Sequence, residues 1–330
     1  MQNYATQEGR INKYKGEMLA YAMPVEVLCK TGTNHKMPKN VSENIIFRRV
    51  IPTGGASTNS TTQNRWSVDP ATHLTQEGVT GPAESVSFVD IPVQMQQYSC
   101  LYGYTDKVAD MYEDDIPEIE KKLTGQRMGL VREMIAYGAL KGSTNKFYAG
   151  GTSRATVDEK ITLGLLRKIA RALDGNRATK ITSIISSSPN YGTAPVEQCY
   201  LVYVHTDGAN DIRELPGFVK AVEYGGSTKP MDREIGAVDE FRFITSPELS
   251  SYANAGAASA GTGLYATTAN VDVYPFIIVA EDAWGNVALR GKESFDVTHL
   301  PAKMKTKDDP HGQRGYVGAI FYSAMFVQND

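Results

Sequence analysis

A polar stretch of thirty residues constrains the fold of this chain more than any other feature. Residues 53–82 are rich in Gly, Ser, Thr, Asn and Pro, and they separate two segments with strand-like alternation, 43–51 and 84–106. A structureless loop of this length is uncommon inside a compact domain. If each arm keeps about 12 to 15 residues extended, a hairpin here reaches on the order of 40 to 50 Å from the body. We therefore predict a long projecting hairpin, which has too little apolar surface of its own and gains its stability from a neighbouring molecule.

The strongest helix signal follows this hairpin. Asp115 and Glu118 have the spacing of a capping box, Pro117 lies in the first turn, and Gly142 is suited to end the helix. At 1.5 Å per residue the helix is roughly 35 to 40 Å long. Apolar side chains at three- and four-residue steps predict a single stripe along it, formed by Ile116, Ile119, Leu123, Leu130, Met134 and Tyr137.

The remaining segments mix helices and strands, and they predict an α+β fold. A second helix is expected at 163–176, with Thr162 as its N-cap and Gly175 as a left-handed C-cap. Residues 1–43 have polar tips and scattered apolar side chains, which suits an arm better than a self-contained core. Further elements are a helical turn at 211–215, a small-residue surface loop at 255–263, and strands at 199–207, 241–246, 272–284 and 315–328.

Composition narrows the classes of function. Of 330 residues, 41% are hydrophobic and 22% charged, which permits a sizeable core in one large domain or two smaller ones. A formal charge of −3 lacks the basic excess of proteins that hold nucleic acid through its phosphates. The first residues form no apolar signal region, and no run reaches the roughly 18 apolar residues of a membrane span. We expect neither tight DNA binding nor a membrane, and a protein that stays in the cytosol unless something carries it out.

A catalytic site is not predicted. His205 and Asp207 stand at the end of a strand, where a catalytic pair could lie. There is no G-x-S-x-G elbow and no third partner at a recognisable spacing, so a hydrogen-bonded pair at a strand end is the better interpretation. An oligomeric hydrolase using these two residues is kept as an alternative.

Metal and nucleotide sites are not predicted either. The acidic group Glu113, Asp114 and Asp115 precedes a helix, where the macrodipole favours it without a cation. The segment with Asp308, Asp309 and His311 is typical of a turn. No Gly-rich phosphate loop occurs. The thiols Cys29, Cys100 and Cys199 lack the spacing of a zinc site or a disulfide framework, and we expect them to be buried.

Interface residues are expected on the projecting hairpin and beside it. Arg48, Arg49, Arg65 and Trp66 combine basic and aromatic groups, a mixture favoured at protein interfaces. Asp69 and Pro70 follow Trp66 in the same polar, turn-rich sequence, which cannot bury itself. These residues are candidates for contacts between subunits, and plain solvent exposure is the open alternative.

Six segments have sequences that recur together in one known family and stand in that family's order: 74–115, 130–151, 203–225, 231–247, 274–291 and 309–327. They resemble the major capsid proteins of tailed bacteriophages, in particular the family typified by the lytic phage N-four. The resemblance extends between residues 72 and 327. One departure is Cys100, where the family has a glycine after the Gln-Tyr pair.

The resemblance implies the HK-97-type capsid fold and a structural role. Its parts would be an N-arm at 1–43, an E-loop at 44–92, a P-domain with a long spine helix at 93–160 and 301–330, and an A-domain at 161–300. Subunits would form hexamers and pentamers of an icosahedral shell that encloses double-stranded DNA and contacts it weakly. Implied partners are a portal protein, a separate scaffolding protein and an optional decoration protein. The subunit would be made in the host bacterial cytoplasm and end in the virion, without enzymatic activity, cofactor or metal. An encapsulin-like nanocompartment shell is the nearest alternative.

Overall fold

The computed structural model describes residues 26–50, 74–78, 80, 86, 88–111, 115–185, 193–224, 231–259, 263–292, 295–305 and 307–329. The strands are β1 (Thr33–Met37), β2 (Asn44–Val50), β3 (Phe88–Gln94), β4 (Gln96–Thr105), β5 (Ile181–Ile185), β6 (Thr193–His205), β7 (Val219–Lys220), β8 (Glu234–Val238), β9 (Phe241–Ser246), β10 (Ile277–Val279), β11 (Trp284–Leu289), β12 (Asp296–Leu300) and β13 (Arg314–Val327). The helices are η1 (Leu28–Lys30), α2 (Asp106–Met111), α3 (Ile116–Lys141), η3 (Arg154–Thr156), α4 (Leu163–Gly175), η4 (Thr206–Gly208), α5 (Ala209–Arg213) and η5 (Ala221–Glu223). None of the helices in this part of the chain is long and apolar enough to span a membrane.

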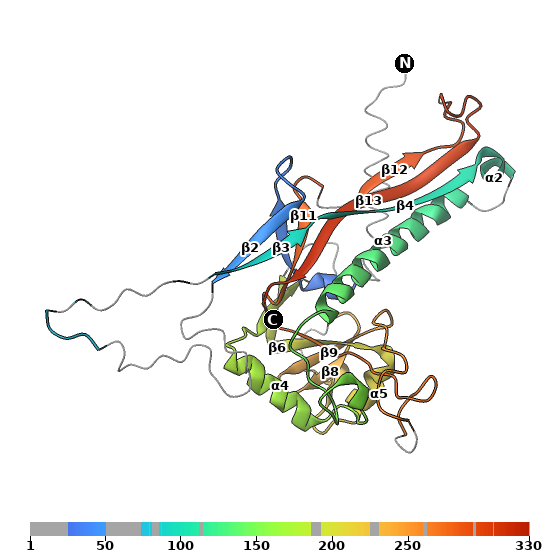
Figure 1. The fold of residues 1–330 in the computed structure, drawn as a ribbon. Coiled ribbons are helices and arrows are strands. Elements are labelled where there is room, and N and C mark those ends of the chain that lie inside the picture. Colours follow the sequence, from blue (N-terminus) through green and yellow to red (C-terminus); the bar gives the residue numbers. More distant parts are fainter. Residues whose placement is uncertain are drawn as a thin grey trace.

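Strand β13 is the centre of the first sheet. It pairs antiparallel with β4, β12 and β11, and β1 adds to β11 in parallel. Helix α3 lies along one face of this sheet (Figure 1). Alternate residues of the strands point towards the helix, so Tyr104, Val317 and Phe321 pack against Met128 of α3. The expected closing strand at 315–328 is confirmed as a buried central strand.

Two tyrosine-glycine pairs bring β4 and β13 close together. Gly315 lies opposite Tyr104 and Gly103 lies opposite Tyr316. A Cβ on Gly315 would come within 2.4 Å of the Tyr104 ring, so only glycine leaves room for this side chain. Cys100 pairs with Ala319 in regular register and packs partly buried on the α3 side. The residue that departs from the family pattern therefore does not disturb the ladder.

Helix α3 begins and ends where the sequence predicts. The side chain of its N-cap Asp115 accepts a hydrogen bond from the Glu118 N–H at 3.3 Å, and Gly142 is the C-cap. The Glu118 side chain bonds Lys121. Together these contacts hold the ends of a 26-residue helix.

The predicted apolar stripe is only partly the face that α3 buries: Tyr137 is buried and Ile116 packs against the core, but the middle of the stripe is exposed. Ile119, Leu123 and Met134 are 44%, 45% and 38% exposed. The buried face carries small and polar residues, among them Thr124, Gly125, Gly129 and Glu133, beside Met128, Tyr137 and Leu140. The physical reason is that the sheet supplies large side chains such as Phe321, so small helix residues allow close packing.

The second sheet has the order β10-β6-β9-β8-β7, with β5 also on β6. β6 and β9 run parallel, and both faces of β6 are buried: Tyr200 and Val202 face one core cluster while Leu201 and Tyr203 face another. A strand covered on both faces reads as a continuous apolar run, as the sequence at 199–204 does. α4 covers one face through Leu166 (Figure 1).

Two local expectations in this region are corrected. The strand expected at 272–284 is only Ile277–Val279, and β11 begins at Trp284. The N-cap Thr162 is confirmed, since its hydroxyl accepts from the Leu165 N–H, but Gly175 is not a left-handed C-cap. Asn176 caps α4, and Arg177 takes the left-handed conformation with φ 56°.

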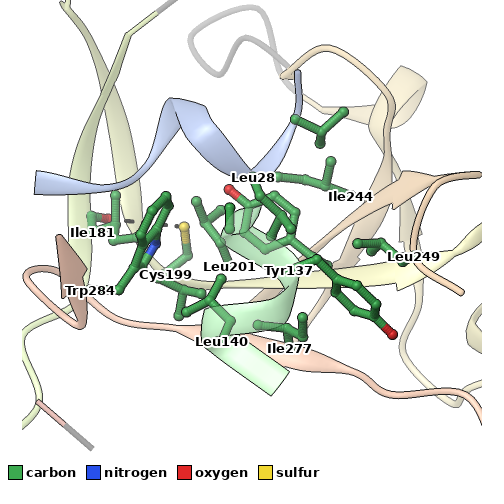
Figure 2. Packing of buried hydrophobic residues seen from close by; sticks show 14 residues of the cluster. Leu28, Tyr137, Leu140, Ile181, Cys199, Leu201, Ile244, Leu249, Ile277 and Trp284 are labelled. Carbon is green, nitrogen blue, oxygen red and sulfur yellow. Dashed lines mark hydrogen bonds between the residues drawn. The ribbon is translucent and has the colours of Figure 1, made fainter. Parts of the chain in front are cut away.

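Within the segment expected as an arm, 1–43, the residues from 26 onward pack on the body. Val27 and Leu28 are buried in a cluster that joins η1 to α3 and to both sheets, with Leu140, Leu201 and Trp284 among its members (Figure 2). β1 extends the first sheet. Residues 1–25 lie outside the described residues.

A buried carboxylate ties η1 to α3. The side chain of Glu133 accepts hydrogen bonds from the backbone N–H of Leu28 at 2.8 Å, Val27 at 3.1 Å and Cys29 at 3.4 Å. Burial raises the pKa of Glu133, and these three bonds oppose the rise. The contact fixes where the chain enters the body.

Candidate functional site: the outer face of the ribbon

β2 and β3 form a two-stranded ribbon that projects beside the first sheet (Figure 1). Its inner face packs on the body through Ile45, Phe47 and Ile91. The Phe47 ring stacks on Phe326 of β13 with centroids 4.4 Å apart, and His35 of β1 lies 4.8 Å from Phe47. The sequence expectation of a hairpin base at this position is confirmed by these two strands.

The opposite side, which we call the outer face of the ribbon, is exposed and carries large apolar side chains beside polar ones. It consists of four cross-strand pairs, Asn44 with Gln94, Ile46 with Pro92, Arg48 with Asp90, and Val50 with Phe88. Ile46, Val50 and Phe88 are 62%, 56% and 52% exposed. None of the four core clusters of the described residues includes these three side chains. Exposed apolar side chains gathered on one face mark a surface for interaction.

An ion pair lies in the middle of the outer face. Arg48 Nε and Nη2 donate to the two carboxylate oxygens of Asp90 at 2.8 and 3.1 Å, a bidentate arrangement. The hydrogen bonds from Arg48 lower the pKa of Asp90. The guanidinium also lies 5.5 Å from the centroid of the Phe88 ring. The charges on this face thus neutralise each other within the chain, and the cross-strand pairs on either side of the ion pair, Ile46 with Pro92 and Val50 with Phe88, are apolar.

The structure brings together only some of the interface residues predicted from the sequence. Arg48 lies on the outer face, whereas Arg49 is half-buried on the other side of β2, opposite Val89. Arg65, Trp66, Asp69 and Pro70 lie outside the described residues. Sequence reasoning missed Ile46, Val50, Phe88 and Asp90. Apolar residues on both faces of NIIFRRV were the available signal, because a half-exposed strand alternates between apolar and polar residues.

His205 and Asp207 form a strand-end pair. The Nδ1 atom of His205 accepts the backbone N–H of Asp207 at 3.1 Å, and Tyr274 donates its hydroxyl to the Asp207 carboxylate at 2.9 Å. The hydrogen-bonded interpretation is confirmed. Nδ1 also lies 3.1 Å from Oδ2 of Asp207, and in the described part of the chain the hydrogen bonds of this pair reach no Ser, Thr or Cys side chain.

The acidic segments have structural roles where they are described. Asp115 is the N-cap of α3. The Asp309 carboxylate accepts from the N–H groups of Gly312 and Arg314, which confirms the turn before β13. Glu113 and Asp114 lie outside the described residues. Within the described ranges no group of His, Cys, Asp and Glu has the arrangement of a metal site.

The cysteines differ in burial. Cys199 is buried, whereas Cys29 and Cys100 are partly buried, so the expectation holds fully for one thiol. Burial raises the pKa of Cys199 to about 11.

A cavity of about 440 Å³ lies between α4 and the turn from β8 to β9. Charged side chains line most of it, and Arg167 bonds Asp239 across it at 2.9 Å. Ser, Thr, Cys and His are missing from the residues that line this cavity, so it holds no evident nucleophile.

The arrangement of a long helix on an antiparallel sheet, a projecting ribbon and a second α/β sheet is that of the HK-97-type fold of phage capsid proteins. The structure is similar to the capsid of Ralstonia phage GP4, with TM-score 0.62 and 12% identity over 92% of this chain and 86% of that chain. It is also similar to the capsid structure of the Cyanophage P-SCSP1u, with TM-score 0.56 and 11% identity over 92% and 85% of the two chains.

A sequence relative points to the same kind of protein. The chain is 23% identical over 275 residues to the major capsid protein of Pseudomonas phage KPP21, covering 77% of this chain and 68% of that protein. No protein-family model matches. Together the relative and the structural neighbours support a tailed-phage major capsid protein, a structural subunit of the virion capsid. The resemblance found in the sequence is confirmed.

Proposed function

We propose that this chain builds an icosahedral shell of hexamers and pentamers around double-stranded DNA, and that the outer face of its ribbon binds a second copy of the chain. The observation that carries the proposal is the set of large apolar side chains on the outer face of β2 and β3, which the described chain leaves uncovered. Leu74 and Val86, in the described parts of the return arm, are exposed as well. Burying such side chains contributes roughly 25 cal/mol per Å² of apolar surface.

We assign the regions of the chain to the parts of a capsid subunit on the basis of this proposed role. We assign residues 44–92 to an E-loop that lies over the neighbouring subunit, and residues 1–25 to an N-arm. The P-domain would comprise 93–160 with the C-terminal strand, and the A-domain most of 161–300. Because β11 and β12 pair with β13, the boundary fits better near residue 283 than at 300.

The polar tip of the E-loop would extend this interface. Trp66 is proposed as the anchor against the neighbour, with Arg65, Asp69 and Pro70 around it, since buried aromatic side chains dominate interface energies. Arg48 would act with Asp90 as a neutral pair at the centre of the contact. Arg49, on the other side of the strand, would lie at its rim.

The remaining roles are proposed on the same basis. A portal protein, a separate scaffolding protein and an optional decoration protein would be its partners, and synthesis would occur in the host bacterial cytoplasm. DNA would be contacted weakly, in keeping with the formal charge of −3. The subunit would work without catalysis, through many reversible contacts that act jointly.

Two matched variants test the proposal. Ile46 and Leu101 are 62% and 61% exposed, but Leu101 lies on β4, outside the ribbon. Ile46→Glu should weaken each contact by about 2 kcal/mol or more and abolish most particle formation, while Leu101→Glu keeps it. Particle yield by sedimentation and electron microscopy, with circular dichroism as the folding control, gives the answer. Equal yields from both variants would count against the ribbon as the contact.

A further inference from the structure

Strand β4 forms one edge of the first sheet. Within the described part of the chain its pairing partner is β13, in a regular antiparallel register over all ten residues. The N–H of the next residue, Asp106, donates to the C=O of Gln313 at 2.9 Å. Because hydrogen-bonded pairs alternate along an antiparallel ladder, the even-numbered residues of β4 make the bonds to β13. The N–H and C=O groups of its odd-numbered residues therefore point to the other side, which we call the open edge.

Both ends of the open edge are marked by the chain itself. At one end the N–H of Met95 donates to the C=O of Glu43, the residue before β2, at 2.9 Å. This bond lies on the side away from β13, as the odd number of Met95 requires. At the other end the chain turns into α2 at Asp106. The open edge therefore runs from residue 97 to residue 105, and Leu101 is its centre.

The sequence of β4 does not protect this edge against pairing. Natural edge strands are kept short or carry charges and proline, because their N–H and C=O groups attract other strands. β7 and β10, at the two ends of the second sheet, have only two and three residues. β4 has ten, and none of them is charged or a proline. The odd-numbered residues from 97 to 105 are all exposed.

We propose that β4 pairs antiparallel with β4 of a second copy, across a two-fold axis at Leu101. In this register each odd-numbered residue of one strand meets an odd-numbered residue of the other, so the outward N–H and C=O groups find partners. Ser99 then lies opposite Gly103 of the second copy, where both side chains are small. Because β4 is uncharged, the two copies approach without like-charge repulsion. One strand thus supplies both sides of a symmetric contact.

This contact is separate from the one proposed for the ribbon and does not depend on it. The backbone ladder carries it, so changes of exposed side chains on β4 have small effects. Leu101→Glu would place two carboxylates opposite each other, which weakens such a pairing about fivefold or less. That variant therefore remains a suitable control for the ribbon.

Disulfide trapping in the full-length chain tests the pairing. Residues in a hydrogen-bonded pair have Cα atoms about 5.5 Å apart, which is within the range of a disulfide. Leu101→Cys in a Cys100→Ser background should therefore form covalent dimers under mild oxidation. Ser99→Cys in the same background is the matched control, because residue 99 lies about 13 Å along the strand from its copy. Non-reducing gels of the concentrated chain, and of any particles that it forms, should show at least about fivefold more dimer for Leu101→Cys.

A proline variant tests the role of the backbone. Ser99→Pro removes an N–H that points to the open edge and leaves the bonds to β13 intact, so the subunit should fold while the Leu101→Cys dimer is lost. Circular dichroism checks the fold. If the correctly folded proline variant keeps the dimer, the strands do not pair through this edge. If Leu101→Cys gives no more dimer than Ser99→Cys, the pairing is wrong whether or not particles form, and Ile46→Glu still decides the ribbon contact separately.

Discussion

The strands of the ribbon and of the six-stranded sheet have similar apolar sequences, but their side chains differ in burial. In the six-stranded sheet, Tyr200, Leu201 and Val202 of β6 are fully buried, because side chains cover both faces of the strand. In the ribbon, Phe47 of β2 packs on the body, but Ile46 beside it is 62% exposed. Apolar residues on both faces of a strand indicate that both faces are covered in the functional state. No described part of the chain supplies a second layer over the outer face of the ribbon.

The difference also concerns independent stability. A two-stranded ribbon is marginal by itself and requires packing on a larger body. Its stability in this chain rests on the inner face, where Phe47 stacks on Phe326. The outer face is therefore free to serve binding, at little cost to the fold of the subunit.

The largest expected effect is in the six-stranded sheet. Phe243 of β9 is fully buried, so Phe243→Ala should lower the free energy of unfolding by about 3 to 5 kcal/mol through lost burial and a cavity. Denaturant titration of the unassembled chain measures this. A loss below about 1 kcal/mol would mean that this sheet is no better packed than the ribbon, and the comparison would fail.

An intermediate effect is expected where η1 meets α3. Glu133→Ala leaves three backbone N–H groups without their acceptor and should lower the free energy of unfolding by about 3 kcal/mol. Asp296→Ala, at an exposed carboxylate of β12 that pairs with the exposed Lys292, is the control and should lose far less. Similar losses would show that the joint does not depend on the buried carboxylate.

The same residue predicts a pH dependence. Burial raises the pKa of Glu133 above its ordinary value of 4.5, so the folded chain holds this proton more tightly than the unfolded chain. Its contribution to stability is therefore greatest below the ordinary pKa and is lost as the pH rises through the raised one. Relative to Glu133→Gln, the parent should gain unfolding free energy on going from about pH 7 to about pH 5. Parallel curves for the two proteins would contradict the raised pKa.

The smallest effect is expected on the ribbon. Phe88 is 52% exposed on the outer face, so Phe88→Ala should change the unfolding free energy of the unassembled chain by less than about 1 kcal/mol. The variant should nevertheless form fewer particles. A loss as large as that of Phe243→Ala would mean that the outer face is already covered within the subunit.

Local signals in the sequence predicted the elements well. Asp115 and Gly142 bound the long helix, and the continuous apolar run after Cys199 became a strand buried on both faces. These features depend on neighbours in the sequence, such as a cap or an unbroken run. The family resemblance supplied the overall fold, which no local pattern contains.

Local sequence signals could not predict which surfaces pack together when they come from distant parts of the chain. The stripe with Ile119 and Leu123 suggested the covered side of α3, yet the covered side holds Thr124 and Gly129. Which side a helix buries depends on the volumes that the sheet presents, and those volumes come from strands distant in the sequence. For the same reason the sequence did not reveal that Leu28 is part of the core.

Because β13 lies at the centre of the first sheet, several strands can complete their pairing only after this C-terminal strand has been added. Its partners on β4 are more than two hundred residues earlier in the sequence, a separation that slows folding because a long loop must close first. Until β13 arrives, β4, β11 and β12 present unpaired edges that can join other chains. Phe326, on which the ribbon rests, arrives with the same strand. A chain in which β13 has not yet paired therefore lacks the support under its ribbon, so the contact surface that we propose can form only after the C-terminal strand has folded.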